Sequence, residues 1–128
     1  MRSAFDYAIV RVVPRVERGE SINAGVVLSC PTRDYLAAQI ALDHARLRAL
    51  APDVDCDELE RALALYPLSA AGDPAGGPIA ALPRSERFHW LVSPRSTIVQ
   101  PSGTHAGLCE DPSATLAKLI ERLVLPTR

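Results

Sequence analysis

The chain has 128 residues and a formal net charge of −1, with 48% hydrophobic and 23% charged residues. This length suits one domain whose core is large enough to need neither a disulfide nor a structural metal. The near-neutral charge argues against nucleic acid as a partner, because proteins that bind it electrostatically are usually basic. The three cysteines are widely spaced, which is typical of reduced thiols in the cytoplasm. No apolar run approaches the roughly 20 residues of a membrane span, so we expect a cytoplasmic protein without a membrane partner.

Three strands are predicted in the first third of the chain. Segments 7–13 and 22–30 are rich in β-branched residues, and the charged, glycine-bearing turn 15–21 joins them. The short turn 31–34 leads into a third strand over 35–42, whose alternate apolar residues share one face. Because these connections are short, we expect an antiparallel meander.

Two helices are predicted after the third strand. Asp43 can cap a short helix that ends at Leu50. Asp55 and Glu58 form a capping box for a second helix, in which apolar residues recur with i, i+3, i+4 and i+7 spacing. We expect Pro67 to end that helix, because proline lacks the amide hydrogen that a helix interior needs.

The rest of the chain alternates irregular and regular segments. Residues 67–84 contain four prolines and three glycines, which predicts a long irregular connection. Residues 85–92 are predicted as a short helix, with a strand as the alternative, and residues 96–100 as a fourth strand. Residues 101–109 are expected to form a loop. An amphipathic helix is predicted over 111–125, where aspartate and proline stand at the N-cap and the first helical position.

This order of elements predicts an α+β fold. The sheet would be antiparallel, with about four strands: the three-stranded N-terminal meander plus one later strand. The helices are expected to pack on one face of this sheet. No internal repeat or linker divides the chain, so we expect a single domain over residues 1–128.

Polar residues of the first hairpin are candidates for binding a ligand. Arg11 shares a strand face with apolar residues, so its guanidinium needs a partner. A structural ion pair with Glu20 is one interpretation. The alternative is an anion site in which Arg11, Arg18 and the backbone of Gly19 face a phosphate or carboxylate. A role for Glu20 as general acid or base has less support, because no second carboxylate stands at a suitable spacing.

Asn23 and Gly25 are expected to lie on one face of the second strand. Neither residue type favours a strand interior. The structural interpretation is a β-bulge, or a helix packed against Gly25. The functional interpretation is that the amide of Asn23 binds a ligand in the space that Gly25 leaves open, because glycine has no side chain.

A second polar cluster surrounds Arg95 and His105. A histidine in a glycine-bearing loop can bind a ligand or transfer protons. A nucleophilic Cys109 activated by His105 is an alternative, and a capping loop before the last helix is the structural interpretation. The spacing of His105, Cys109 and Asp111 is weak for a metal site, and no P-loop, GxGxxG, GxSxG or HExxH motif occurs. We therefore expect no metal and no cofactor.

Two stretches of the chain carry a family resemblance. The first is the hairpin pattern of Tyr7, Arg11, Pro14, Arg18-Gly19-Glu20, Asn23 and Gly25-Val26-Val27-Leu28. The second is the segment GPIAALPRSERFHWLVSPRSTIVQPSGTHAGLCEDP, from Gly77 through Pro112. Together, and in this order, they resemble the bacterial family catalogued as domain of unknown function 3037. Members are often encoded beside HipA-like kinase-fold proteins, so the resemblance implies a partner of that kind.

Two functions of different classes follow. The first is an accessory or binding module that acts through a protein partner, and it predicts an exposed apolar patch that includes Trp90 or the 67–84 segment. The alternative is a small enzyme or ligand-binding domain for an anionic substrate such as a nucleotide. That alternative requires the residues of the two polar clusters to converge on one concave site. The sequence names no reaction and leaves the oligomeric state open.

Overall fold

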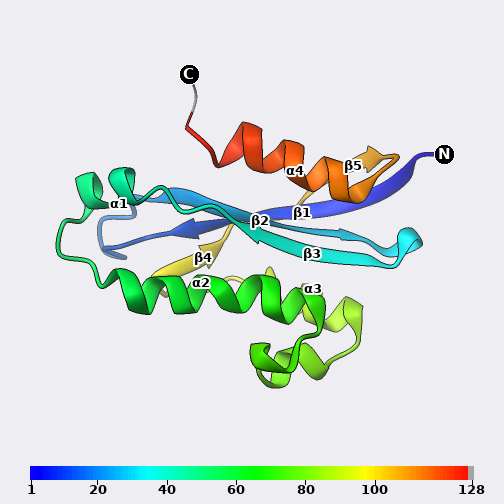
Figure 1. Cartoon of the computed structure of the whole chain (residues 1–128), viewed down its shortest axis with the longest axis horizontal. Helices are drawn as coiled ribbons and strands as arrows, with labels where there is room; N and C mark the ends of the chain where they lie inside the picture. The colour runs from blue at the N-terminus through cyan, green and yellow to red at the C-terminus, as the bar shows by residue number, and fades with distance from the viewer. Residues whose placement is uncertain (127–128) are drawn as a thin grey trace.

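The computed structural model describes residues 1–126, and within them the chain forms a five-stranded sheet and four α-helices (Figure 1). The strands are β1 (Ser3–Val12), β2 (Ile22–Cys30), β3 (Tyr35–Ile40), β4 (Val99–Pro101) and β5 (His105–Cys109). The helices are α1 (His44–Leu50), α2 (Cys56–Ala71), α3 (Arg84–Leu91) and α4 (Pro112–Leu123). The predicted α+β class with an antiparallel sheet is confirmed, although the sheet has five strands instead of about four.

Strand β1 lies at the centre of the sheet. One edge pairs with β2 and, through it, with β3, as the predicted meander requires. The other edge pairs first with β4 and then with β5. The expectation of a loop over 101–109 is therefore wrong, because Cys109 to His105 pair with Ser3 to Tyr7. Strand β5 has little β-propensity of its own, and its extended form comes from pairing with a strand about 100 residues away.

The helices cover both faces of the sheet, so the expectation that they share one face is wrong (Figure 1). Helices α2 and α3 pack on one face, which we call the α2 face. Helix α4 packs on the opposite face, which we call the α4 face. Val26 and Leu28 contribute to the core under α4, while Val27 contributes to the core under α2. A continuous apolar run of this kind is typical of a strand that is buried on both faces.

A β-bulge at Ala24 changes which residues of β2 face which helix. Val10 pairs with Gly25 and Arg11 pairs with Asn23, so Ala24 is the additional residue. Of the two structural interpretations, the β-bulge is confirmed, and the neighbours of Gly25 belong to β3 and not to a helix. Asn23 and Gly25 do not share a face. The Asn23 amide donates to the carbonyl oxygen of Leu123 at the end of α4 (2.9 Å).

Three aspartates begin helices as the sequence predicts. Asp43 accepts a hydrogen bond from the backbone N–H of Arg46 (3.1 Å), and Asp55 accepts one from Glu58 (3.1 Å). Asp111 accepts two, from residues 113 and 114 in the first turn of α4. The segment predicted as a helix with a strand as the alternative is the helix α3.

Helix α2 does not end at Pro67, as predicted, but continues to Ala71. The residues beyond Pro67 include Ser69 and Ala70, which are buried against the rest of the chain. Their burial outweighs the one backbone hydrogen bond that Pro67 cannot make. The helix ends at Gly72, whose φ of 73° suits a left-handed cap. The segment after it contains two short 3₁₀ turns, Pro74–Gly76 and Pro78–Ala81, so it is less irregular than expected.

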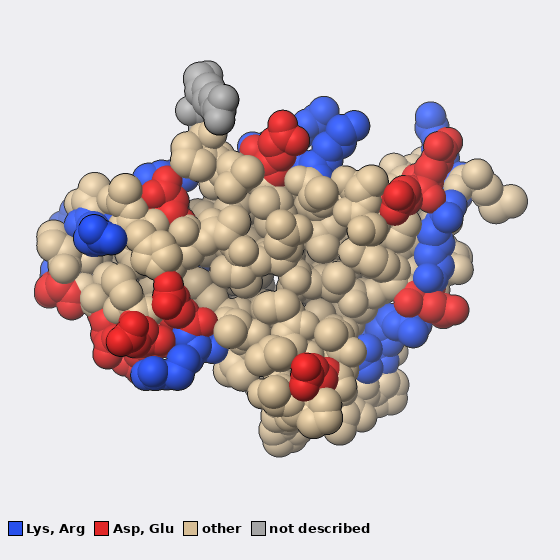
Figure 2. All heavy atoms as spheres, in the orientation of Figure 1, with Lys and Arg blue, Asp and Glu red and all other residues tan. Residues whose placement is uncertain are grey.

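Charged side chains are unevenly distributed over the face that contains β3. Figure 2 shows Lys, Arg, Asp and Glu at the two ends of this face and along the outer side of α4. The middle, where β3 runs between α4 and α2, is free of them (Figures 1 and 2).

Replacement of Gly107 by alanine should destabilise the fold. Gly107 is opposite Phe5 in the β1–β5 ladder, and a Cβ atom there would lie 2.6 Å from Cζ of the buried Phe5 ring. We expect Gly107→Ala to lower the free energy of unfolding by about 1–3 kcal/mol, as other overpacked sites do. Urea denaturation measures this change.

Gly103→Ala is the matched control, because a Cβ at Gly103 meets no atom within 4 Å among the described residues. Its effect should stay within about 0.5 kcal/mol. Equal destabilisation by both variants would show that contact with Phe5 is not the cause.

Candidate functional site

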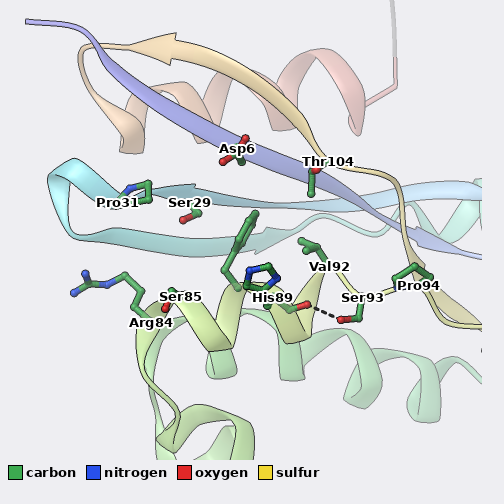
Figure 3. Close-up of a pocket in the computed structure, with 11 residues that line it drawn as sticks. Asp6, Ser29, Pro31, Arg84, Ser85, His89, Val92, Ser93, Pro94 and Thr104 are labelled. Atoms are coloured by element: carbon green, nitrogen blue, oxygen red, sulfur yellow. Dashed lines mark hydrogen bonds between the residues drawn. The ribbon is translucent and has the colours of Figure 1, made fainter.

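A cleft of about 810 Å³ lies between α3 and the sheet (Figure 3). We call it the α3 cleft. Asp6 and Ser29 form part of its floor, and they are paired across β1 and β2 on the α2 face. Phe88, His89 and Val92 of α3 form the facing wall. The volume falls within the range of about 300–1,000 Å³ that small-molecule sites usually occupy.

The polar groups of the α3 cleft are mostly left available to a ligand. Among the residues that Figure 3 draws, the one hydrogen bond that a side chain donates runs from Oγ of Ser93 to the carbonyl oxygen of His89 (2.6 Å). Asp6 belongs to none of the ion pairs found within residues 1–126. Arg84 at the rim is already paired with the exposed Asp34 (3.1 Å). The floor of the cleft therefore carries a free negative charge.

A second feature is the aromatic surface around Trp90, the only tryptophan in the sequence. Trp90 is 48% exposed, and the guanidinium of Arg95 lies 4.8 Å from its ring centroid. Arg95 also donates to the hydroxyl of Tyr66 (2.9 Å) and to the backbone carbonyl of Trp90. We define the Trp90 surface as Leu65, Trp90 and Arg95, which are supported by the buried Tyr66. The guanidinium therefore packs over the indole ring, while nearly half of the residue is exposed.

Hollows lie on both sides of the Trp90–Arg95 pair. One has a volume of about 310 Å³ and is lined by Leu65 and Tyr66 of α2 together with Trp90 and Arg95. The other has a volume of about 580 Å³ and lies toward Leu82 and the α3 cleft. The two residues therefore form a ridge between two concave regions.

The candidate residues from the sequence lie at three separate places. Arg95 belongs to the Trp90 surface on the α2 face. Arg18 and Glu20 are paired with each other in the exposed turn after β1, and their hydrogen bond lowers the pKa of the Glu20 carboxyl. Arg11, Asn23 and His105 lie on the α4 face. The two polar clusters do not converge on one concave site.

Arg11 is not paired with Glu20, so the interpretation as a structural Arg11–Glu20 ion pair is wrong. Its Nη2 donates to the carbonyl oxygen of Pro101 (3.3 Å), while its buried Nε has no partner among the described residues. Asn23 and Gln100 are its neighbours on the adjacent strands.

His105 contacts the ring of Tyr7 at a centroid distance of 5.2 Å. Tyr7 and Arg11 are four residues apart on β1, which corresponds to about 13 Å. His105 and Cys109 have the same separation on β5, so His105 does not activate this thiol. Burial also raises the pKa of the Cys109 thiol, which favours the unreactive neutral form.

Sequence reasoning missed Asp6, Ser29 and His89 as site residues. Ser29 and His89 are unremarkable within their own segments, and only the fold brings α3 over the floor that β1 and β2 form. One signal was present: Asp6 is a charged residue within a strand whose other residues are mostly apolar. Such a residue on a partly covered sheet face marks a solvent-filled region.

Two further findings concern the described residues as a whole. No group of three or more His, Cys, Asp or Glu side chains within residues 1–126 is arranged to hold a metal ion. In the same part of the chain, no helix is both long enough and apolar enough to cross a membrane.

These features define an α+β protein with a central antiparallel sheet, a cleft beside α3 and an aromatic surface at Trp90. The chain belongs to the family described as protein of unknown function (DUF3037), whose sequence profile matches residues 7–124. The family resemblance of the two sequence stretches is thus confirmed. No curated protein and no solved structure matches the chain.

The buried Tyr66 hydroxyl should make stability fall at high pH. Burial raises the pKa of Tyr66, and Arg95 opposes that shift in part. An unfolded chain loses this proton near pH 10, but the folded protein loses it only at higher pH. The free energy of unfolding should therefore decrease as pH rises above about 10.

The comparison that isolates this effect is wild type against Tyr66→Phe, by urea denaturation from about pH 8 to about pH 11. The variant lacks the ionising group, so its stability should fall less steeply with pH. Parallel curves for the two proteins would contradict the assignment.

Proposed function

We propose that this protein is a binding module that acts through a protein partner, which it contacts with the Trp90 surface. The observation that carries this proposal is the half-exposed indole of Trp90, held against Arg95. Tryptophan and arginine are enriched among the residues that dominate protein–protein affinity. A side chain that already packs against a neighbour also loses less entropy on binding.

The surroundings of Trp90 support the same proposal. Leu65 is 47% exposed and lines a hollow together with Trp90. The hollow on the other side of the ridge is lined by Leu82 and Pro94. A central aromatic anchor between apolar depressions is the usual arrangement of an interface core. The guanidinium of Arg95 is engaged with Tyr66 and Trp90, so it serves as support for the ring.

The partner that we propose is a HipA-like kinase-fold protein, and the proposed location is the cytoplasm. Support for the partner comes from family membership, since members are often encoded beside such proteins. The partner would cover the indole ring of Trp90.

Fluorescence and titration calorimetry test this proposal with the HipA-like protein encoded nearest to the gene. Because Trp90 is the only tryptophan, its emission should shift to shorter wavelength when the partner covers it, if the partner's own emission is subtracted. Trp90→Ala should weaken binding by about 30-fold, equivalent to about 2 kcal/mol.

Leu108→Ala is the matched control, because Leu108 is 64% exposed on β5, outside the Trp90 surface. It should bind as wild type does. Absence of binding by wild type, or wild-type affinity in Trp90→Ala, would refute the proposal.

A ligand-binding domain is the second candidate, and the α3 cleft favours it. The cleft places the free carboxylate of Asp6 beside Ser29 and opposite the ring of Phe88. An anionic substrate such as a nucleotide would meet this carboxylate, and the arginine at the rim is already paired. The ligand that we propose for this cleft therefore carries a cationic group on an apolar body.

A thermal-shift comparison of agmatine with ATP tests the second candidate. Agmatine should raise the melting temperature of wild type, because a ligand that binds only the folded state stabilises it. Asp6→Asn should abolish that shift, while Glu110→Gln, at an exposed acid outside the cleft, should retain it. A shift with ATP alone, or an equal agmatine shift in both variants, would count against a cation site at Asp6.

A further inference from the structure

Strand β3 forms one outer edge of the sheet. It pairs with β2 on its inner side, and nothing among residues 1–126 pairs with its outer side. An outer strand of this kind presents backbone N–H and C=O groups that can bond to another extended strand.

The hydrogen-bond pattern identifies which residues of β3 face outward. The N–H of Ala41 bonds to the carbonyl oxygen of Ala24 on β2 (2.8 Å). Backbone groups alternate between the two edges of an antiparallel strand, so the odd-numbered residues of β3 turn theirs toward β2. Leu36, Ala38 and Ile40 therefore turn their N–H and C=O groups toward solvent.

This edge lacks the features that normally keep edge strands from pairing. The sequence of β3 is YLAAQI, with no charged residue, proline or glycine. Natural proteins usually place lysine, proline or a bulge on an exposed edge. The adjacent part of α2 contributes the uncharged residues Ala64 and Pro67, which line a shallow hollow of about 430 Å³ next to Ala38, together with Glu60 and His44. Figure 2 shows this band as the uncharged middle of the face.

The charged residues next to the two ends of β3 have net charges of opposite sign. Arg33 and Arg84 lie at the beginning of the strand, where Arg84 is paired with Asp34 and the Arg33 guanidinium donates to Oγ of Ser3 (3.0 Å) and to the carbonyl oxygen of Met1. Asp43 and Glu60 lie at its end, where Glu60 is hydrogen-bonded to His44 (2.6 Å). A two-fold rotation about the middle of β3 would bring the basic end of one copy against the acidic end of another. The charge pattern is therefore complementary to itself.

We propose that β3 pairs with β3 of a second copy of this chain, antiparallel about a two-fold axis at Ala38. Residues directly opposite each other in such a pair share a face, so the two-fold must pass through a residue. An axis at Ala38 pairs Leu36 with Ile40 of the second copy. In this register every outward N–H and C=O group of β3 forms a hydrogen bond with the second copy. The same rotation brings the end of β3 that is next to Arg33 and Arg84 near the end of the second copy that is next to Asp43 and Glu60.

The first test is the molar mass of the full chain by light scattering, over a concentration series at low salt. We expect twice the 13.8 kDa of one chain. Ala38→Pro should give a monomer, because it removes an outward N–H and leaves the bonds to β2 intact. Arg33→Glu should weaken the dimer about tenfold, because it replaces a positive charge at the basic end of β3 with a negative charge that faces the acidic end of the second copy.

The second test fixes the register by cross-linking, in a Cys56→Ser background that removes the more accessible cysteine. Two residues in a hydrogen-bonded antiparallel pair have Cα atoms about 5.5 Å apart, which suits a disulfide. Mild oxidation of Ala38→Cys should therefore produce a covalent dimer. Gln39→Cys is the matched control, because Gln39 is exposed on the same strand. In the proposed register, the Cα atoms of residue 39 in the two chains would lie more than about 7 Å apart, which is too far for a disulfide.

A monomer at every concentration would overturn the proposal. A dimer that both Ala38→Pro and Arg33→Glu leave intact would also overturn it, since the contact would then use another surface. Equal cross-linking by Ala38→Cys and Gln39→Cys would exclude the Ala38 register. If circular dichroism shows that Ala38→Pro is unfolded, Arg33→Glu and the cross-linking pair decide the question.

Discussion

The pairing of β1 with strands on both of its edges is the constraint on which the rest of the structure depends. β1 bonds to β2 along one edge and to β4 and β5 along the other, so it holds together the first and last thirds of the chain. Its side chains also contribute to both cores, with Val10 facing α2 and Phe5 facing α4. The bulge at Ala24 lets β2 follow β1 while it supplies Ala24 to one core and Val26 to the other. Both helical layers therefore take their positions from one strand pair.

The sequence predicted features that depend on neighbouring residues. Asp43, Asp55 and Asp111 cap helices because the groups they bond lie two or three residues away. Two predictions about features that depend on distant residues were wrong. Strand β5 exists because β1 is beside it, and Pro67 stays in α2 because the residues beyond it are buried. The apolar run Val26-Val27-Leu28 did contain the information that both faces of the sheet are covered.

The candidate site shows the same difference between what neighbouring residues predict and what distant residues determine. Arg11, Asn23 and His105 stand out within their own strands, yet the structure gives Arg11 and Asn23 backbone partners and His105 a ring contact. The α3 cleft is made mostly from residues that are ordinary in isolation, whereas the sequence did indicate that Trp90 belongs to an exposed apolar patch. Asp6 and Phe88 are more than 80 residues apart, and no local pattern connects them. Arg95 belongs to a surface feature, but through Trp90 and Tyr66 rather than through the other residues of its predicted cluster.

The position of β1 also has a consequence for the order in which the chain folds. During synthesis, β1, β2 and β3 leave the ribosome early and can form their hairpins. The outer edge of β1 then has no partner until residues 99–109 emerge, and the core on the α4 face stays uncovered until α4 follows. Such long-range pairing is slow because the intervening chain must be ordered first. The nascent protein therefore exposes an open strand edge and an apolar sheet face from the emergence of β1 until α4 has followed, which is the interval in which a chaperone would be of most use to it.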